Sequence, residues 1–154
     1  MLQVKDKDQL GYLGTAYALL ELAKRNMRGL ITPDFDFDIL CNNGVRLEVK
    51  TSRLHNRVDS KRAQWQFTNS RRRWIWAKGA KYNVRTEPIS RHCDFYVLIG
   101  LNKELEQPRF FIISKETMEK AGQVIQLHPD YPHRGKWEDF YKNEDKWDLI
   151  TKGW

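Results

Sequence analysis

A chain of 154 residues with 40% hydrophobic and 12% aromatic residues can bury a substantial core, and we expect one domain over residues 1–154. No stretch approaches 18 consecutive apolar residues, no signal peptide is evident, and two cysteines are too few for a disulfide framework or a cysteine zinc site, so we expect a cytoplasmic protein with no membrane partner. The formal net charge of +7 favours a polyanionic partner.

The first predicted element is a helix over residues 8–28. Its apolar residues recur at helical spacing, and Gly29 is expected to end it. The face that packs on the rest of the protein is expected to carry Leu10, Leu13, Tyr17, Leu20 and Met27.

A β-hairpin is predicted next, over residues 35–51. Both arms alternate apolar and polar residues, which is the pattern of half-buried strands. The arms are joined by Asn42-Asn43-Gly44, a three-residue loop whose glycine suits the left-handed position. The apolar face is expected to hold Phe35, Phe37, Ile39, Cys41, Leu47, Val49 and Thr51, and the other face Asp36, Asp38, Leu40, Glu48 and Lys50.

The length of this loop sets the pairing of the two arms. With three loop residues, Asp38 faces Glu48 and Asp36 faces Lys50, with paired Cβ atoms about 4.5–5.5 Å apart. Two carboxylates this close repel unless a proton or a cation lies between them. Hard oxygen ligands of this kind suit Mg²⁺, which takes few protein carboxylates and keeps several waters.

Two alternatives stay open at this point. A two-residue loop would pair Asp38 with Val49 and separate the carboxylates. Acids beside a lysine also suit the solvated face of a purely structural hairpin. Against the structural interpretation, Asp and Glu are poor strand formers.

The same residues resemble the PD-(D/E)XK, or restriction-endonuclease-like, nucleases. The resemblance consists of an acid in a first strand (Asp38), the tripeptide Glu48-Val49-Lys50 in the next strand, and a preceding helix that ends at Arg28-Gly29. It covers residues 8–52 well and is closest to small Holliday-junction-resolvase-like and intron-encoded endonucleases. It implies an α/β fold with a central mixed β-sheet flanked by helices, in the order α-β-β-β-α-β, as a single nuclease domain.

The resemblance also implies a metal-dependent DNA endonuclease that hydrolyses phosphodiester bonds with a metal-activated water. Asp38, Glu48 and the backbone carbonyl of Val49 would hold Mg²⁺, with Mn²⁺ as a substitute. Lys50 would position the attacking water and stabilise transition-state charge. The substrate would be double-stranded or branched DNA, and cutting two strands favours a homodimer.

Two departures from the family pattern concern the acids. The literal Pro-Asp is Pro33-Asp34, although only Asp38 faces Glu48 in the expected pairing. Many members also carry an acid in the first helix, where this chain has Tyr17. Candidate accessory residues are Glu21, Asp36 and Gln66, for each of which an ordinary exposed polar role is the alternative.

The positive charge is concentrated directly after Lys50. Residues 53–91 contain 11 Lys or Arg and 2 acids, whereas the rest of the chain contains 16 Lys or Arg and 18 acids. Cations alternate with indoles in the run RRRWIWAK at 71–78, which suits phosphate contact with stacking or groove insertion, although Trp74 and Trp76 also suit a core. The candidate nucleic-acid contacts are Arg53, Arg57, Lys61, Arg62, Arg71, Arg72, Arg73, Lys78, Lys81 and Arg85.

The remaining elements are expected to complete an α/β arrangement. Residues 69–92 are expected to form a long connection with some structure of its own, anchored by Asp94. Ser114 is expected to cap a helix over 115–121 that Gly122 ends. We also expect strands at 64–68, 93–100 and 109–113, a helix at 136–141, and packing of Trp137, Phe140, Tyr141 and Trp147 on the body.

Two other function classes remain as alternatives to the nuclease. One is a nucleic-acid-binding module that keeps the fold without the activity, and the other is an RNA- or protein-interaction domain with an accidental motif. The intact set of Asp38, Glu48 and Lys50 favours the enzyme. Histidine pairs at zinc spacing and nucleotide-binding glycine motifs are absent from the sequence.

Overall fold

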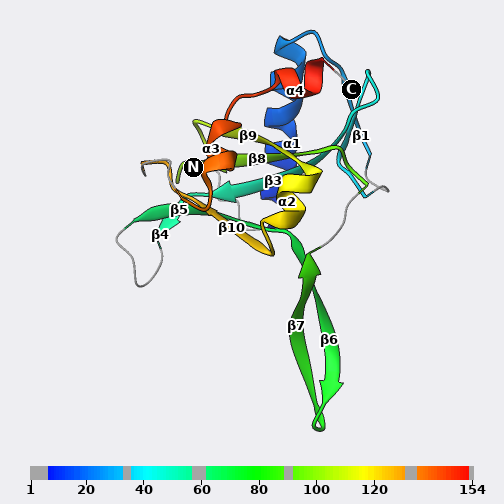
Figure 1. Cartoon of the computed structure of the whole chain (residues 1–154), viewed down its shortest axis with the longest axis vertical. Coiled ribbons are helices and arrows are strands. Elements are labelled where there is room, and N and C mark those ends of the chain that lie inside the picture. Colours follow the sequence, from blue (N-terminus) through cyan, green and yellow to red (C-terminus); the bar gives the residue numbers. More distant parts are fainter. Residues whose placement is uncertain (1–6, 33–35, 57–61, 89–91, 131–134, 153–154) are drawn as a thin grey trace.

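The centre of the fold is a five-stranded mixed sheet in the order β1-β2-β3-β8-β9 (Figure 1). The computed structural model describes residues 7–32, 36–56, 62–88, 92–130 and 135–152. Strands β3 and β8 are parallel, and the other neighbours are antiparallel. The strands are β1 (Gly29–Ile31), β2 (Ile39–Cys41), β3 (Arg46–Arg53), β8 (Phe95–Leu101) and β9 (Arg109–Ser114).

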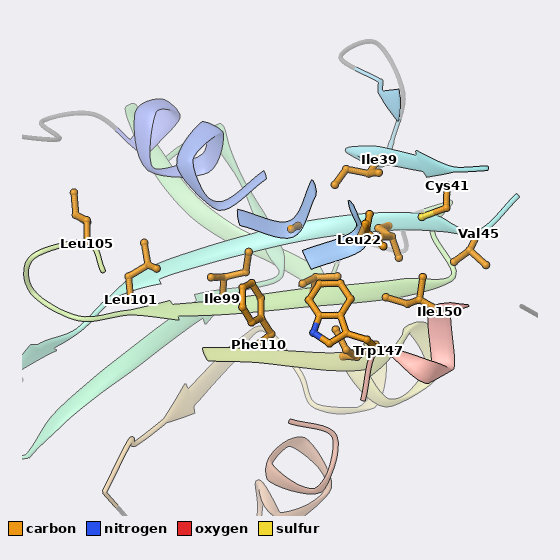
Figure 2. Close-up of a cluster of buried hydrophobic side chains, with 14 residues drawn as sticks. Leu22, Ile39, Cys41, Val45, Ile99, Leu101, Leu105, Phe110, Trp147 and Ile150 are labelled. Carbon is orange, nitrogen blue, oxygen red and sulfur yellow. The ribbon is translucent and has the colours of Figure 1, made fainter. Parts of the chain in front are cut away.

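The side chains of this sheet alternate between two hydrophobic cores. The core on one face lies under α1 (Lys7–Lys24) and α4 (Asp148–Thr151), and includes Leu22, Ile99 and Trp147 (Figure 2). The core on the other face includes Tyr96 and Leu98. It is covered by α2 (Lys115–Lys120), α3 (Glu138–Lys142) and a small sheet of β10 (Val124–Leu127), β5 (Ala63–Thr68) and β4 (His55–Asn56). The expected α/β class, with a central mixed sheet flanked by helices, is confirmed.

The first helix packs directly on β3 through a glycine. A Cβ atom at Gly14 would lie 1.7 Å from the Oγ1 atom of Thr51, so only glycine allows this approach. The expected end of the helix at Gly29 is wrong, because α1 stops at Lys24, residue Asn26 has a φ of 58°, and Gly29 opens β1. The expected packing of Leu20 is also wrong, since its side chain is exposed.

The basic segment contains a two-stranded antiparallel ribbon, formed by β6 (Ser70–Ala77) and β7 (Ala80–Pro88). We refer to residues 70–88 as the ribbon. It extends away from the rest of the molecule, and its two strands contact each other far more than any other element (Figure 1). The turn consists of Lys78 and Gly79, whose φ angles of 49° and 73° are those of a type I′ hairpin. The expected long connection over 69–92 is therefore mostly regular β structure.

Several later elements agree with the sequence. Strands β8 and β9 are buried, and the side chain of Ser114 accepts a hydrogen bond from the N–H of Thr117 at the start of α2. Both cysteines are buried and free. Among the described helices, none is long and apolar enough to cross a membrane. The expected order α-β-β-β-α-β is wrong, because in the described part of the chain all of the strands β1 to β9 follow α1 before the next helix, α2.

Candidate active site

The hairpin of β2 and β3 keeps the register that its loop length predicted at two residue pairs, but the expected pairing of Asp38 with Glu48 is not among them. Ile39 pairs with Leu47 and Leu40 with Arg46, so the three-residue loop is confirmed. Strand β2 begins only at Ile39, however, and Asp38 lies just before it. The N–H of Asp38 still donates to the carbonyl of Leu47, at 2.8 Å, which fixes Asp38 beside β3.

The alternation predicted for residues 35–41 breaks at Asp38. Ile39 belongs to the core under α1, whereas Phe37 packs against the core on the other face of the sheet. Two hydrogen bonds from Thr32 stabilise this break in the alternation of side chains. The Thr32 N–H donates to the carbonyl of Asp38 at 3.0 Å, and the Thr32 hydroxyl donates to the carbonyl of Phe37 at 2.7 Å. The expected shared face of Phe37 and Ile39 is therefore wrong.

The carboxylate of Asp38 binds the backbone of β3 at Val49. Its Oδ2 atom accepts a hydrogen bond from the Val49 N–H at 2.7 Å. The carbonyl of Arg46 accepts a hydrogen bond from the N–H of Asp94, so the backbone groups of Arg46 point toward β8. The direction of the backbone N–H and C=O groups alternates from residue to residue along a strand, so those of Val49 point away from β8. On that side β2 has already ended. The structure thus brings Asp38 and the Val49 backbone together.

Glu48 and Lys50 form an ion pair that is largely withdrawn from water. The Nζ atom of Lys50 lies 3.1 Å from the Oε1 atom of Glu48, and the two side chains are 18% and 8% exposed. They are two residues apart on β3 and so share the face of the sheet that carries the second core. Lysine and glutamate are rarely buried unless they are paired.

The cysteine beside this pair is chemically inert. Burial, followed by the nearby negative charge of Glu48, raises the pKa of Cys93 to about 12. Burial, followed by the charge of Asp94, raises the pKa of Cys41 to about 11. Both thiols are therefore protonated at neutral pH, and neither is an activated nucleophile.

The donor atoms of the site suit a hard cation that needs few protein ligands. Asp38, Glu48 and the Val49 backbone offer oxygen atoms alone. Across the described ranges, no group of three or more His, Cys, Asp or Glu is arranged to hold a metal. Mg²⁺ commonly binds through one or two carboxylates and completes its shell with water and substrate phosphate, whereas Ca²⁺ and Zn²⁺ require more ligands from the protein.

The three candidate accessory residues make other contacts. Glu21 lies on α1 and pairs with Lys24 and Arg25 at 2.8 and 2.6 Å. Partial burial raises the pKa of Glu21, but the hydrogen bonds and positive charges of these two partners outweigh it and leave the pKa lowered.

Asp36 and Gln66 make hydrogen bonds to residues outside the ion pair. The expected pairing of Asp36 with Lys50 is wrong, because β2 is too short and the Asp36 carboxylate lies 2.9 Å from the Nδ1 atom of His92. Gln66 is exposed, and its backbone N–H donates to the hydroxyl of Ser52.

Two contacts that the sequence did not predict connect the site to the ends of the ribbon. Before the ribbon, the fully buried Asn69 accepts a hydrogen bond from the hydroxyl of Tyr96, which pairs with Glu48 across β3 and β8. After the ribbon, His92 binds Asp36, two residues from Asp38. No local pattern signals either contact, since each joins residues far apart in the sequence.

Asp94 anchors β3 instead of the basic connection. Its carboxylate accepts from the Arg46 backbone N–H at 2.8 Å, and from the Arg46 guanidinium at 2.8 and 3.2 Å. This two-point pair fixes the start of β3 against the start of β8, two residues before Glu48. Its position at the start of a buried strand was visible in the sequence, but its partner was not.

The candidate nucleic-acid contacts fall into three groups. Arg53, Arg62, Lys78 and Lys81 are exposed, and Arg53 donates to the carbonyl of Lys103. Arg57 and Lys61 lie outside the described residues. The backbones of Arg71, Arg72, Arg73 and Arg85, like those of Trp74 and Trp76, belong to the ribbon.

Comparison with solved structures gives a likeness that covers nearly the whole chain. The sequence matches no protein-family model, and no curated protein is significantly similar to it. Among solved structures, the bacterial homing endonuclease I-Ssp6803I is similar with a TM-score of 0.70 and 18% sequence identity. The superposition covers 96% of this chain and 94% of that one. At this identity the likeness establishes a shared fold along nearly the whole chain.

Proposed function

We propose that the protein is a Mg²⁺-dependent DNA endonuclease of the PD-(D/E)XK type. The observation that carries the proposal is the hydrogen bond from the Val49 N–H to the Asp38 carboxylate. Val49 lies on β3 between Glu48 and Lys50, which form the largely buried ion pair. The shared fold with a protein described as a homing endonuclease supports the same conclusion. Mn²⁺ is expected to substitute for Mg²⁺.

Each residue of the site has a distinct role in this proposal. Asp38, Glu48 and the Val49 carbonyl would hold the cation, which supplies Lewis-acid stabilisation of the scissile phosphate and a more acidic water. The ammonium of Lys50, held 3.1 Å from Glu48, orients the attacking water and offsets the charge that develops on the phosphate oxygens. Asp94 acts only through Arg46, by fixing the start of β3.

The proposed substrate is duplex or branched DNA, and the proposed assembly is a homodimer. The ribbon and its flanking basic residues would neutralise the phosphates beside the cleavage site. Two sites related by a two-fold axis match the symmetry of the duplex, since each site cuts one strand. Light scattering on the purified protein, with and without DNA, measures the assembly directly.

Cleavage assays test the catalytic proposal. Supercoiled plasmid and a four-way junction are incubated with wild type in Mg²⁺, Mn²⁺ or EDTA, beside Asp38→Asn, Glu48→Gln and Lys50→Met. We expect metal-dependent cleavage by wild type and a loss of about 10²–10³-fold or more in each variant. Glu144→Gln is the matched control, because Glu144 forms a half-buried ion pair with Arg109 outside the site.

The assay also separates the proposal from its main alternative. A wild-type protein that binds both substrates and cuts neither would be a nucleic-acid-binding module with the nuclease fold. Variants at the three positions that cut like wild type would place the active site elsewhere.

A further inference from the structure

The ribbon has two faces of different composition, and its pairing assigns residues to each. Paired residues of an antiparallel ribbon lie on one face, and successive residues alternate between faces. The pairs Arg73–Val84, Ile75–Tyr82 and Ala77–Ala80 form a mostly uncharged face. We call the opposite face the basic face, and its residues are Arg72, Trp74, Trp76, Lys81, Asn83 and Arg85.

Two features of the basic face favour an anionic partner. Arg72 pairs directly with Arg85, and like charges opposite each other destabilise a ribbon unless an anion accompanies them. The ribbon as a whole contains six Lys or Arg and one acid. Arginine and asparagine are also the residues that bind the guanine and adenine edges of base pairs with two hydrogen bonds.

The dimensions of the ribbon suit one groove of the double helix. The major groove of B-DNA, about 12 Å wide, admits a two-stranded ribbon directly, whereas the minor groove, about 6 Å wide, admits one only where the duplex is bent or the groove is widened. Strand β6 spans about 27 Å at 3.4 Å per residue, which is less than one helical turn of about 34 Å. The deep, narrow major groove of A-form RNA excludes such an element.

The ends of the ribbon lie beside the candidate active site. Asn69 precedes the ribbon and binds Tyr96, which neighbours Glu48, while His92 follows it and binds Asp36. A duplex that contacts the base of the ribbon would therefore lie close to Asp38 and Glu48.

We propose that the ribbon enters the major groove of double-stranded DNA and reads base pairs with its basic face. The assignment rests on the proposed nuclease function, and it is tested by binding alone. The ribbon thereby becomes the element that selects where the duplex is placed against the site.

The first measurement asks which groove is used. The probe is a fluorescent mixed-sequence 30-base-pair duplex, in EDTA so that no cleavage occurs. We expect glucosylated 5-hydroxymethylcytosine, which fills the major groove, to raise Kd by about tenfold or more. Saturating the minor groove with netropsin should change Kd less than threefold. The reverse result, or equal effects of the two treatments, would overturn the proposal.

The second measurement asks which face is used. Arg85→Gln removes one charge from the basic face, and Arg73→Gln removes one charge from the other face of the same ribbon. We expect about a tenfold rise in Kd for Arg85→Gln and less than threefold for Arg73→Gln. Equal effects would mean that the ribbon contributes charge alone. Asn83→Ala, which removes no charge, is the second variant and should also weaken binding, with an unchanged melting temperature as the control for folding.

The last comparison tests the class of nucleic acid and separates the two proposals. Single-stranded DNA or double-stranded RNA that binds as tightly as the duplex would refute major-groove reading. If the binding effects are as predicted but the protein cuts no DNA, the nuclease proposal is refuted and the ribbon assignment stands. If the protein cuts DNA in a metal-dependent way but Arg85→Gln binds DNA as tightly as wild type, the ribbon assignment is refuted and the nuclease proposal stands.

Discussion

Glu48 and Lys50 place two opposite charges where both side chains are largely withdrawn from water. A buried carboxylate loses its hydration, and here a lysine ammonium at 3.1 Å offsets that loss. We expect Lys50→Met to lower the free energy of unfolding by about 1–3 kcal/mol, because it removes the cation from the buried carboxylate. The double variant Glu48→Gln/Lys50→Met should recover part of that loss, as measured by urea denaturation. A single Lys50→Met variant as stable as wild type would show that the pair does not interact in solution.

Asp145 is a residue at which charge opposes stability. Partial burial, followed by the negative charges of Glu144 and Glu21, raises its pKa above the ordinary value of 3.8. Below that value the side chain is protonated in the folded and unfolded states alike, and as pH rises through the raised pKa the ionised form destabilises the folded state.

The matching variant is Asp145→Asn. The φ of 55° at this position suits asparagine. We expect a melting temperature no more than about 1 °C above wild type at pH 7, because the side chain is exposed and water screens its charge, and no difference well below pH 3.8. A difference of the same size at both pH values would exclude an electrostatic origin.

At the scale of elements, the contact of α1 with β3 controls how the helix approaches the sheet. A Cβ atom added at Gly14 would meet Thr51 at 1.7 Å, whereas one added at Gly11 would meet nothing within 4 Å. We expect Gly14→Ala to destabilise the protein by about 1–3 kcal/mol through displacement of α1.

Gly11→Ala is the matched control on the same helix. It should stabilise the protein by about 0.5–1 kcal/mol, because alanine favours the helix over glycine. Opposite signs for the two variants in chemical denaturation are the diagnostic result. Equal effects would mean that the helix can shift away from β3 without cost.

The hairpin shows which part of the site was predictable from sequence. Loop length determined the pairing of Ile39 with Leu47, because both signals are local. The break at Asp38 was not predictable, since it depends on hydrogen bonds from Thr32, a residue of the preceding loop. The sequence did not predict the ribbon as a pair of strands. Arginines and tryptophans occur on alternating and on adjacent positions there, so polar and apolar residues do not separate into two faces.

At the scale of the whole molecule, the proposed metal should couple to folding. A cation that binds only the folded state stabilises it by about 1.4 kcal/mol at ten times its Kd, or about 3–5 °C in melting temperature. We expect Mg²⁺ to raise the melting temperature of wild type and not of Asp38→Asn or Glu48→Gln. An equal rise in all three proteins would indicate binding elsewhere. Glu144→Gln, which alters the pair with Arg109, should respond like wild type.

The way in which the ribbon is attached to the body determines which insertions and deletions the protein can accept. Ser70 pairs with Pro88 at its base, so the chain leaves and re-enters the body through adjacent positions. Residues can be added or removed in facing pairs along β6 and β7 while Asn69, His92 and the sheet stay where they are. In the proposed role of the ribbon, such changes would alter which DNA target is preferred and would leave in place the groups proposed to perform hydrolysis.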